Sequence, residues 1–244
     1  MTTDPNEPPE ATAAHDTAKP YGTPTAPRIT IRGEAVLDAQ PELAGITITI
    51  TARGTDRRTT LDDLTHRNAQ ALDLVKTYGD ALDTLETGTL LITPQLRERG
   101  RGERVRAYTG LVRISATLTD FTALGELITR LAELDLTRVD GPSWSLRPGS
   151  PAYRTARGQA VHSAVQRARE YADALGSRLV ALTELTDEGI AGPTPYRERS
   201  KMRTTAYSAA GAEEPPEPLD LEPERQTIHA SVTAHFTITP PDLS

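Results

Sequence analysis

The chain has 244 residues, enough for one large domain or two small ones, and a formal net charge of −7. This negative charge argues against general binding to the phosphates of nucleic acids. There is no cysteine, which excludes disulfides and thiolate nucleophiles on this chain. Because aromatic residues make up only 4%, the core must be built mainly from Leu, Val, Ile and Ala.

Residues 1–27 are rich in proline and poor in large apolar side chains. Such a segment cannot bury enough surface to offset its ordering entropy, so we expect a disordered tail. It lacks the basic start and apolar run of a secretory signal, and no apolar run in the sequence approaches the ~20 residues that span a bilayer. We therefore expect a cytoplasmic protein without a membrane span.

The first two predicted strands are 28–36 and 45–52, in which apolar and polar residues alternate. Because they are joined by a short segment around Pro41, they are predicted to pair with each other in antiparallel fashion, with one solvated face. A helix follows, for which Thr60 is the predicted N-cap and Gly79 the stop signal.

The next segments predict a long hairpin, with strands 87–96 and 105–118 joined by a charged turn. After the hairpin, Asp120 is expected to cap a helix over 121–134. A further strand is predicted over 139–146, with Trp144 in its inner face.

The most regular stretch is a helix that begins after Ser150. Alanine recurs there at every fourth position, at Ala152, Ala156, Ala160, Ala164, Ala168 and Ala172. These residues form one stripe of small side chains, which allows a close approach to a sheet. Gly176 is the expected end of the helix, and the run 179–182 is predicted to be a buried strand.

The last predicted strand, 226–239, alternates over its whole length and must return to a sheet to bury its apolar face. Before it, residues 189–223 are rich in Pro, Ala, Gly and Glu, which predicts a long irregular arm. The element order ββαββαβαββ predicts an α+β domain over 28–240, with mixed, largely antiparallel sheets and three helices packed on one side.

Several segments, taken in their order and spacing, resemble the SIMPL-domain family. They include ITIRGEAV, ITITITARG, a strand ending in Pro94 and Gln95, AYTGLVRISATLTDF, VDGPSWSLRPGS and the closing IHASVTAHFTI. The resemblance covers about residues 28–240 and implies a function that is poorly defined, without catalytic residues to carry over. Relatives include exported proteins linked to oxidative-stress defence and a periplasmic antigen that forms a ring-like homo-oligomer. The resemblance therefore implies self-assembly and a link to oxidative-stress tolerance, which would be indirect in a chain without cysteine.

The charged hairpin turn is a candidate interaction site. Its cations are Arg97, Arg99, Arg101, Arg104 and Arg106, with Glu98 and Glu103 between them. Such a cluster is able to bind an anionic ligand or an acidic protein partner. The plainer interpretation, which we favour, is a solvated hairpin tip, because exposed runs of mixed charge are usually solvating.

The histidines do not converge on a metal site. His66 and His162 fall on the polar faces of predicted helices, and His229 and His235 lie ~20 Å apart along the outward face of the last strand, too far apart for one metal ion. The sequence also lacks a phosphate-binding loop, a nucleophile elbow and a zinc-protease motif. We expect no metal, no cofactor and no catalytic residue.

The arm is the second candidate interaction site, since Tyr196, Met202 and Tyr207 are of the types enriched at protein contacts. One interpretation is a disordered loop, and the other is an arm that docks on a neighbouring subunit. Our first hypothesis is therefore a non-enzymatic homo-oligomer that acts through its surfaces. The alternatives are an adaptor that binds an acidic protein partner through the Arg-rich turn, and an enzyme with a site between subunits.

Overall fold

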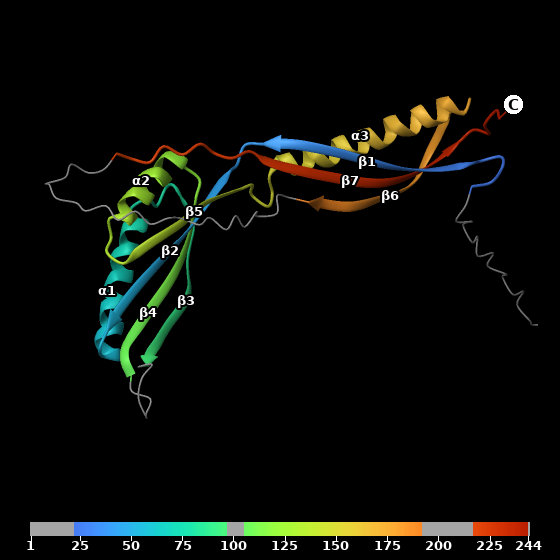
Figure 1. Ribbon diagram of the computed structural model, residues 1–244. Coiled ribbons are helices and arrows are strands. Elements are labelled where there is room, and N and C mark those ends of the chain that lie inside the picture. Colours follow the sequence, from blue (N-terminus) through green and yellow to red (C-terminus); the bar gives the residue numbers. More distant parts are fainter. Residues whose placement is uncertain (1–21, 97–104, 192–216, 244) are drawn as a thin grey trace, which may run out of the picture. The chain divides into compact units, whose positions relative to one another are not determined.

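The computed structural model describes residues 22–96, 105–191 and 217–243 (Figure 1). The elements are β1 (Arg28–Ala39), β2 (Leu43–Gly54), α1 (Arg57–Lys76), β3 (Leu82–Leu96), β4 (Val105–Leu118), α2 (Phe121–Ala132), β5 (Thr137–Ser145), α3 (Pro151–Ala174), β6 (Leu179–Ala191) and β7 (Gln226–Ile238). This is the predicted order of an α+β fold with three helices. None of the helices among the described residues combines the length and the apolar character needed to cross a bilayer.

The chain divides into two compact units. The first consists of Met1–Ala35, Arg157–Gly189 and Ser231–Ser244, and the second of Val36–Ala156 and Ile190–Ala230. The strands form a three-stranded sheet in the order β1-β7-β6 and a four-stranded sheet in the order β3-β4-β2-β5.

In the second unit, α1 and α2 cover one face of the four-stranded sheet (Figure 1). The alternation expected from the sequence supplies the core, since Ile46, Ile48 and Ile50 of β2 are buried beside the apolar residues of β4. The predicted hairpin of β3 and β4 is confirmed. Its strands pair in antiparallel fashion, from Leu82 opposite Leu118 to Leu96 opposite Val105.

The helix caps confirm one prediction and correct another. Asp120 caps α2, because its carboxylate accepts hydrogen bonds from the backbone N–H groups of Thr122 and Ala123. The predicted cap Thr60 is wrong. Helix α1 begins one turn earlier, capped by Asp56, and Thr60 is buried with its hydroxyl donating to the carbonyl of Asp56. The apolar pattern starts only at Leu61, so it did not reveal the polar first turn.

The predicted pairing of the first two strands is also wrong. Strand β2 pairs with β4 on one side and with β5 on the other, so neither of its edges is open to β1. Strand β1 belongs to the other sheet and lies beside β7. The backbone N–H of Ile238 donates to the carbonyl of Pro27, and Thr227 contacts Asp38, so β1 and β7 are antiparallel.

Strand β7 returns to the sheet as predicted. Every second residue from Gln226 to Ile238 is buried, including Ile228, Val232 and Phe236. Helix α3 covers one face of the three-stranded sheet with its predicted stripe (Figure 1), in which Ala156, Ala160, Ala164, Ala168 and Ala172 are fully buried.

Strand β6 is longer than expected, and the prediction that it is buried is wrong. Val180, Leu182 and Leu185 are 63%, 51% and 47% exposed. The reason is its position at one edge of a three-stranded sheet, where it has a single neighbouring strand, β7.

Only the two ends of the predicted arm fall among the described residues. Its start continues β6 as far as Ala191. Its last part lies along α2, where the backbone N–H of Leu219 donates to the hydroxyl of Thr129 at 3.2 Å.

Candidate functional site

A group of interacting polar side chains lies on the outward face of the sheet in the first unit. Arg28, Thr30 and Arg32 alternate along β1 with residues that face α3. Paired residues of antiparallel strands point to the same face of a sheet. The side chains of Arg28, Thr30 and Arg32 therefore lie on the same face as the polar side chains of β7. They also share this face with Glu184 and Glu188 of β6, on the far side of β7. We call this group the charged face.

Two arginines and two glutamates link the outer strands of the charged face. Arg28 donates to Glu184 at 3.2 Å, and Arg32 lies 3.4 Å from Glu188. Arg32 also pairs with Glu34 of its own strand at 3.0 Å. Each of the three carboxylates therefore has an arginine beside it, and the pairs with Glu184 and Glu188 join β6 to β1 across β7.

Glu188 has the most polar partners of this group. The hydroxyl of Thr233 donates to one of its carboxylate oxygens, and the hydroxyl of Ser231 lies 3.4 Å from the other. The hydrogen bond from Thr233 lowers the pKa of Glu188, and the charge of Arg32 and the hydroxyl of Ser231 act in the same direction, against the opposing effect of desolvation. Glu188 is thereby stabilised as the anion.

A threonine, a histidine and a glutamate lie in sequence on the same face. The hydroxyl of Thr30 shares a hydrogen bond of 2.8 Å with Nδ1 of His235, and Nε2 of His235 lies 3.9 Å from Glu184. The order resembles that of a nucleophile, a base and an orienting acid. Here, however, Glu184 is already bonded to Arg28, and all three side chains lie on an open strand face, where solvent competes for the same bonds. The geometry supports a structural hydrogen-bond chain better than nucleophilic catalysis.

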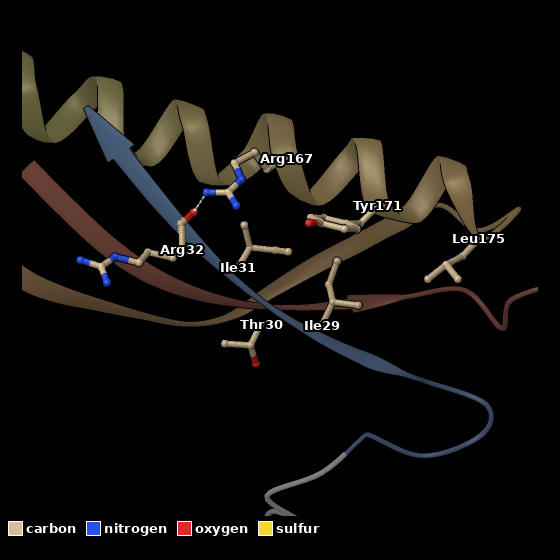
Figure 2. A pocket seen from close by; sticks show the side chains of 7 residues that line it. All are labelled: Ile29, Thr30, Ile31, Arg32, Arg167, Tyr171 and Leu175. Atoms are coloured by element: carbon tan, nitrogen blue, oxygen red, sulfur yellow. Dashed lines mark hydrogen bonds between the residues drawn. The ribbon is translucent and has the colours of Figure 1, made fainter. Parts of the chain in front are cut away.

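A hollow of about 320 Å³ lies between β1 and α3, on the opposite side of β1 from the charged face (Figure 2). Ile29 and Ile31 of β1 face Tyr171 and Leu175 of α3 across it, while Thr30 points away. At one end, the guanidinium of Arg167 donates to the carbonyl of Arg32 at 2.6 Å. The hollow is therefore mostly apolar, with a cation at one end.

Most of the predicted interaction residues belong to the Arg-rich turn and the arm. Arg97, Arg99, Arg101, Arg104, Tyr196, Met202 and Tyr207 lie outside the described residues. Arg106 is exposed in β4. The contribution of the Arg-rich turn and of the arm therefore stays a prediction.

The described histidines lie on α1, α3 and β7. His66 contacts Gln70 within α1, and His235 is part of the charged face. In the part of the chain that the structure describes, no three His, Asp or Glu side chains are grouped so that they could hold a metal ion.

The sequence reasoning missed the charged face, although two signals were present. Arg28 and Arg32 share one face of β1, and Glu184 and Glu188 share one face of β6. The sequence does not show that the arginines of β1 pair with the glutamates of β6. The paired residues are far apart in the chain, and β7 lies between the two strands.

Comparison with known proteins identifies one family. The SIMPL family, described as a protein of unknown function (DUF541), matches residues 29–236. No curated protein matches the chain.

Proposed function

The chain belongs to the SIMPL family, and from this premise we propose that it is a self-assembling protein that acts through its surfaces rather than by catalysis. The observation that carries the proposal is the exposed edge strand β6. Strand β6 pairs with β7 along one of its two edges. Among the described strands, none pairs with its second edge. Three large apolar side chains on this strand are about half exposed or more.

An edge strand of this kind favours association with a further strand. Its open side presents a row of backbone N–H and C=O groups, and pairing with another chain satisfies them. Folded proteins usually block such edges with proline or lysine, and β6 contains neither. Burial of Val180, Leu182 and Leu185 in the contact adds a hydrophobic contribution.

Strand β3 also exposes large apolar residues, including Leu90 and Leu91, but its edge is less suited to pairing. Its register with β4 shifts at three places, and it contains Pro94, which lacks a donor. Bulges and proline are features that protect an edge from further pairing. The edge of β6, which contains no proline, is therefore the better candidate.

The test is the native mass measured by light scattering at micromolar concentration. The wild-type chain is expected to be an oligomer, and the variant Val180→Lys/Leu182→Lys to be a monomer with an unchanged circular dichroism spectrum. Val36→Lys is the matched control, because Val36 is 62% exposed in β1, and it is expected to leave the mass unchanged. A monomeric wild-type chain contradicts self-assembly, and an oligomeric double variant contradicts the role of β6.

The arm is proposed to add a second contact through Tyr196, Met202 and Tyr207. Deletion of residues 192–216, joined by a short glycine-serine linker, separates this contribution from that of β6. We expect the deletion to lower the oligomeric state. An unchanged native mass would show that the arm has no part in assembly and would leave the proposal for β6 intact.

A further inference from the structure

We propose that the hollow between β1 and α3 binds a small amphipathic carboxylate, that is, an aliphatic chain that ends in a carboxylate group. The hollow lies beside β1, at the opposite end of the three-stranded sheet from β6, so the proposal holds whether or not β6 mediates assembly. It rests on the shape of the hollow, on its apolar walls and on the charge of Arg167 at one end.

The hollow is elongated and has the size of a small-ligand site. Its volume of about 320 Å³ is at the lower end of the range of ligand pockets, roughly 300–1,000 Å³. On α3 its lining extends from Arg167 to Leu175, a distance of ~12 Å along a helix that rises ~1.5 Å per residue. On β1 the lining extends from Arg32 to Ile29 (Figure 2). A long space of small volume suits one extended chain better than a ring system.

The walls are apolar along most of this length. Ile29 and Ile31 face the hollow from β1, and Leu175 lies at the end away from Arg167 (Figure 2). The ring of Tyr171 completes the wall on the side of α3, although this residue is 53% exposed. An alkyl chain in the hollow would cover these side chains, and the burial of apolar surface favours binding.

Arg167 supplies a positive charge at one end of the hollow. Its Nη1 donates to the backbone carbonyl of Arg32 at 2.6 Å, which holds the guanidinium in place. The carbonyl is neutral, and none of the ion pairs among the described residues includes Arg167. Glu170, one turn further along α3, accepts a hydrogen bond from Gln166 instead, at 3.1 Å. The charge of Arg167 is therefore available to an anionic ligand.

A carboxylate is the group that fits this cation. A guanidinium has five N–H donors in a fixed fork, and the bond to Arg32 uses one of them. The remaining donors are able to bind both oxygens of a carboxylate, the geometry in which arginine recognises such groups. Because the apolar walls begin beside Arg167, a chain attached to the bound carboxylate would continue toward Leu175.

Titration of the full-length chain with octanoate tests the site, followed by calorimetry and by NMR shifts of the backbone amides. We expect saturable binding, with the shifts concentrated at 29–32 and 167–175. The affinity should rise from butyrate through hexanoate to octanoate by roughly twofold to fourfold per methylene. Octanol, which has the chain without the charge, should bind about tenfold more weakly than octanoate. These comparisons use the wild-type chain, so they do not depend on the folding of a variant.

Two arginine variants then test the role of the cation. Arg167→Gln is expected to weaken octanoate binding about tenfold. Arg169→Gln is the matched control, because it removes the same charge from an exposed position of α3 that does not line the hollow. It should leave the affinity unchanged. Tyr171→Ala should also weaken binding, since it removes part of the apolar wall.

The results that overturn the proposal are specific. Absence of saturable octanoate binding overturns the site itself, as do shifts that lie elsewhere in the chain. Equal affinities for octanoate and octanol overturn recognition of the carboxylate. Equal losses in Arg167→Gln and Arg169→Gln would show a general effect of charge and would also overturn it.

Discussion

Gly33 of β1 lies directly against the backbone of Ala160 in α3. A Cβ added at Gly33 would be 2.1 Å from the carbonyl oxygen of Ala160 and 2.6 Å from the Cβ of Ala164. The alanine stripe of the helix and the missing side chain of the strand together allow this approach. A larger residue on either side would separate the helix from the sheet, because packed cores have little spare volume.

Gly33→Ala is expected to destabilise the first unit by about 1–3 kcal/mol, the usual cost of overpacking. The obstructing atoms belong to the helix backbone, which cannot rotate away. Thermal or urea unfolding followed by circular dichroism measures the loss. Gly158→Ala is the control, since Gly158 lies in α3 with nothing near its added Cβ. That change is expected to stabilise the helix by roughly 0.5–1 kcal/mol. Equal stability of the two variants would refute the close packing at Gly33.

Gly125→Ala should release the segment around Leu219 from α2. Helix propensity alone predicts that the change stabilises α2. An added Cβ, however, would lie 2.1 Å from the carbonyl oxygen of Leu219. We expect faster hydrogen exchange or proteolysis at 217–221, without loss of the helix signal. Thr129→Val removes the hydrogen bond from Leu219 and the one that Thr129 donates to the carbonyl of Gly125, but it adds no atom against Leu219, and it should have a smaller effect in the same direction. Unchanged protection in Gly125→Ala would contradict this contact.

Asp120→Ala is expected to cost about 0.5–2 kcal/mol of stability, the usual range for loss of an N-cap. The carboxylate of Asp120 accepts from the N–H groups of Thr122 and Ala123 at 2.9 and 3.1 Å, and alanine leaves both without this partner. Asp120→Asn keeps an acceptor and should lose little. Urea denaturation of the three proteins measures the difference, and similar losses for Ala and Asn would indicate that the charge, not the cap bond, matters.

Protonation of Glu188 should weaken the charged face at acid pH. Its pKa is lowered in the folded chain, first by the hydrogen bond from Thr233. A lowered pKa means that its contribution to stability is fully present above the pKa of the unfolded chain. The contribution is lost as the pH falls through the lowered pKa of the folded state.

Thr233→Val is expected to raise the pKa of Glu188 toward its ordinary value, and Arg32→Gln to raise it less, because the charge of Arg32 is the weaker cause. Carbon-detected NMR titration of the glutamate carboxyl groups measures both. Thr237→Val, on the same face of β7, serves as the control. A pKa that stays low in Thr233→Val would assign the shift to another cause.

Local patterns were sufficient where the periodicity of one segment decides the outcome. The alternation of 226–239 predicted a half-buried strand, and the fourfold repeat of alanine predicted the buried stripe of α3. Both are confirmed, because the apolar face of each element has to be buried whichever partner covers it. The order of elements and the α+β class follow from the same local signals. In the candidate site, the alternation of β1 likewise predicted which of its residues share a face.

Tertiary structure alone decided which elements are partners. Strand β1 lies beside β7, almost 200 residues away, rather than beside β2, because β4 and β5 occupy both edges of β2. The apolar run in β6 is exposed because an edge strand has one neighbour, a property that its own sequence does not encode. For the same reason the pairing of Arg32 with Glu188 appears only in the folded sheet. Side-chain periodicity is set by the geometry of a single segment, whereas pairing depends on competition among all strands for a limited number of edges.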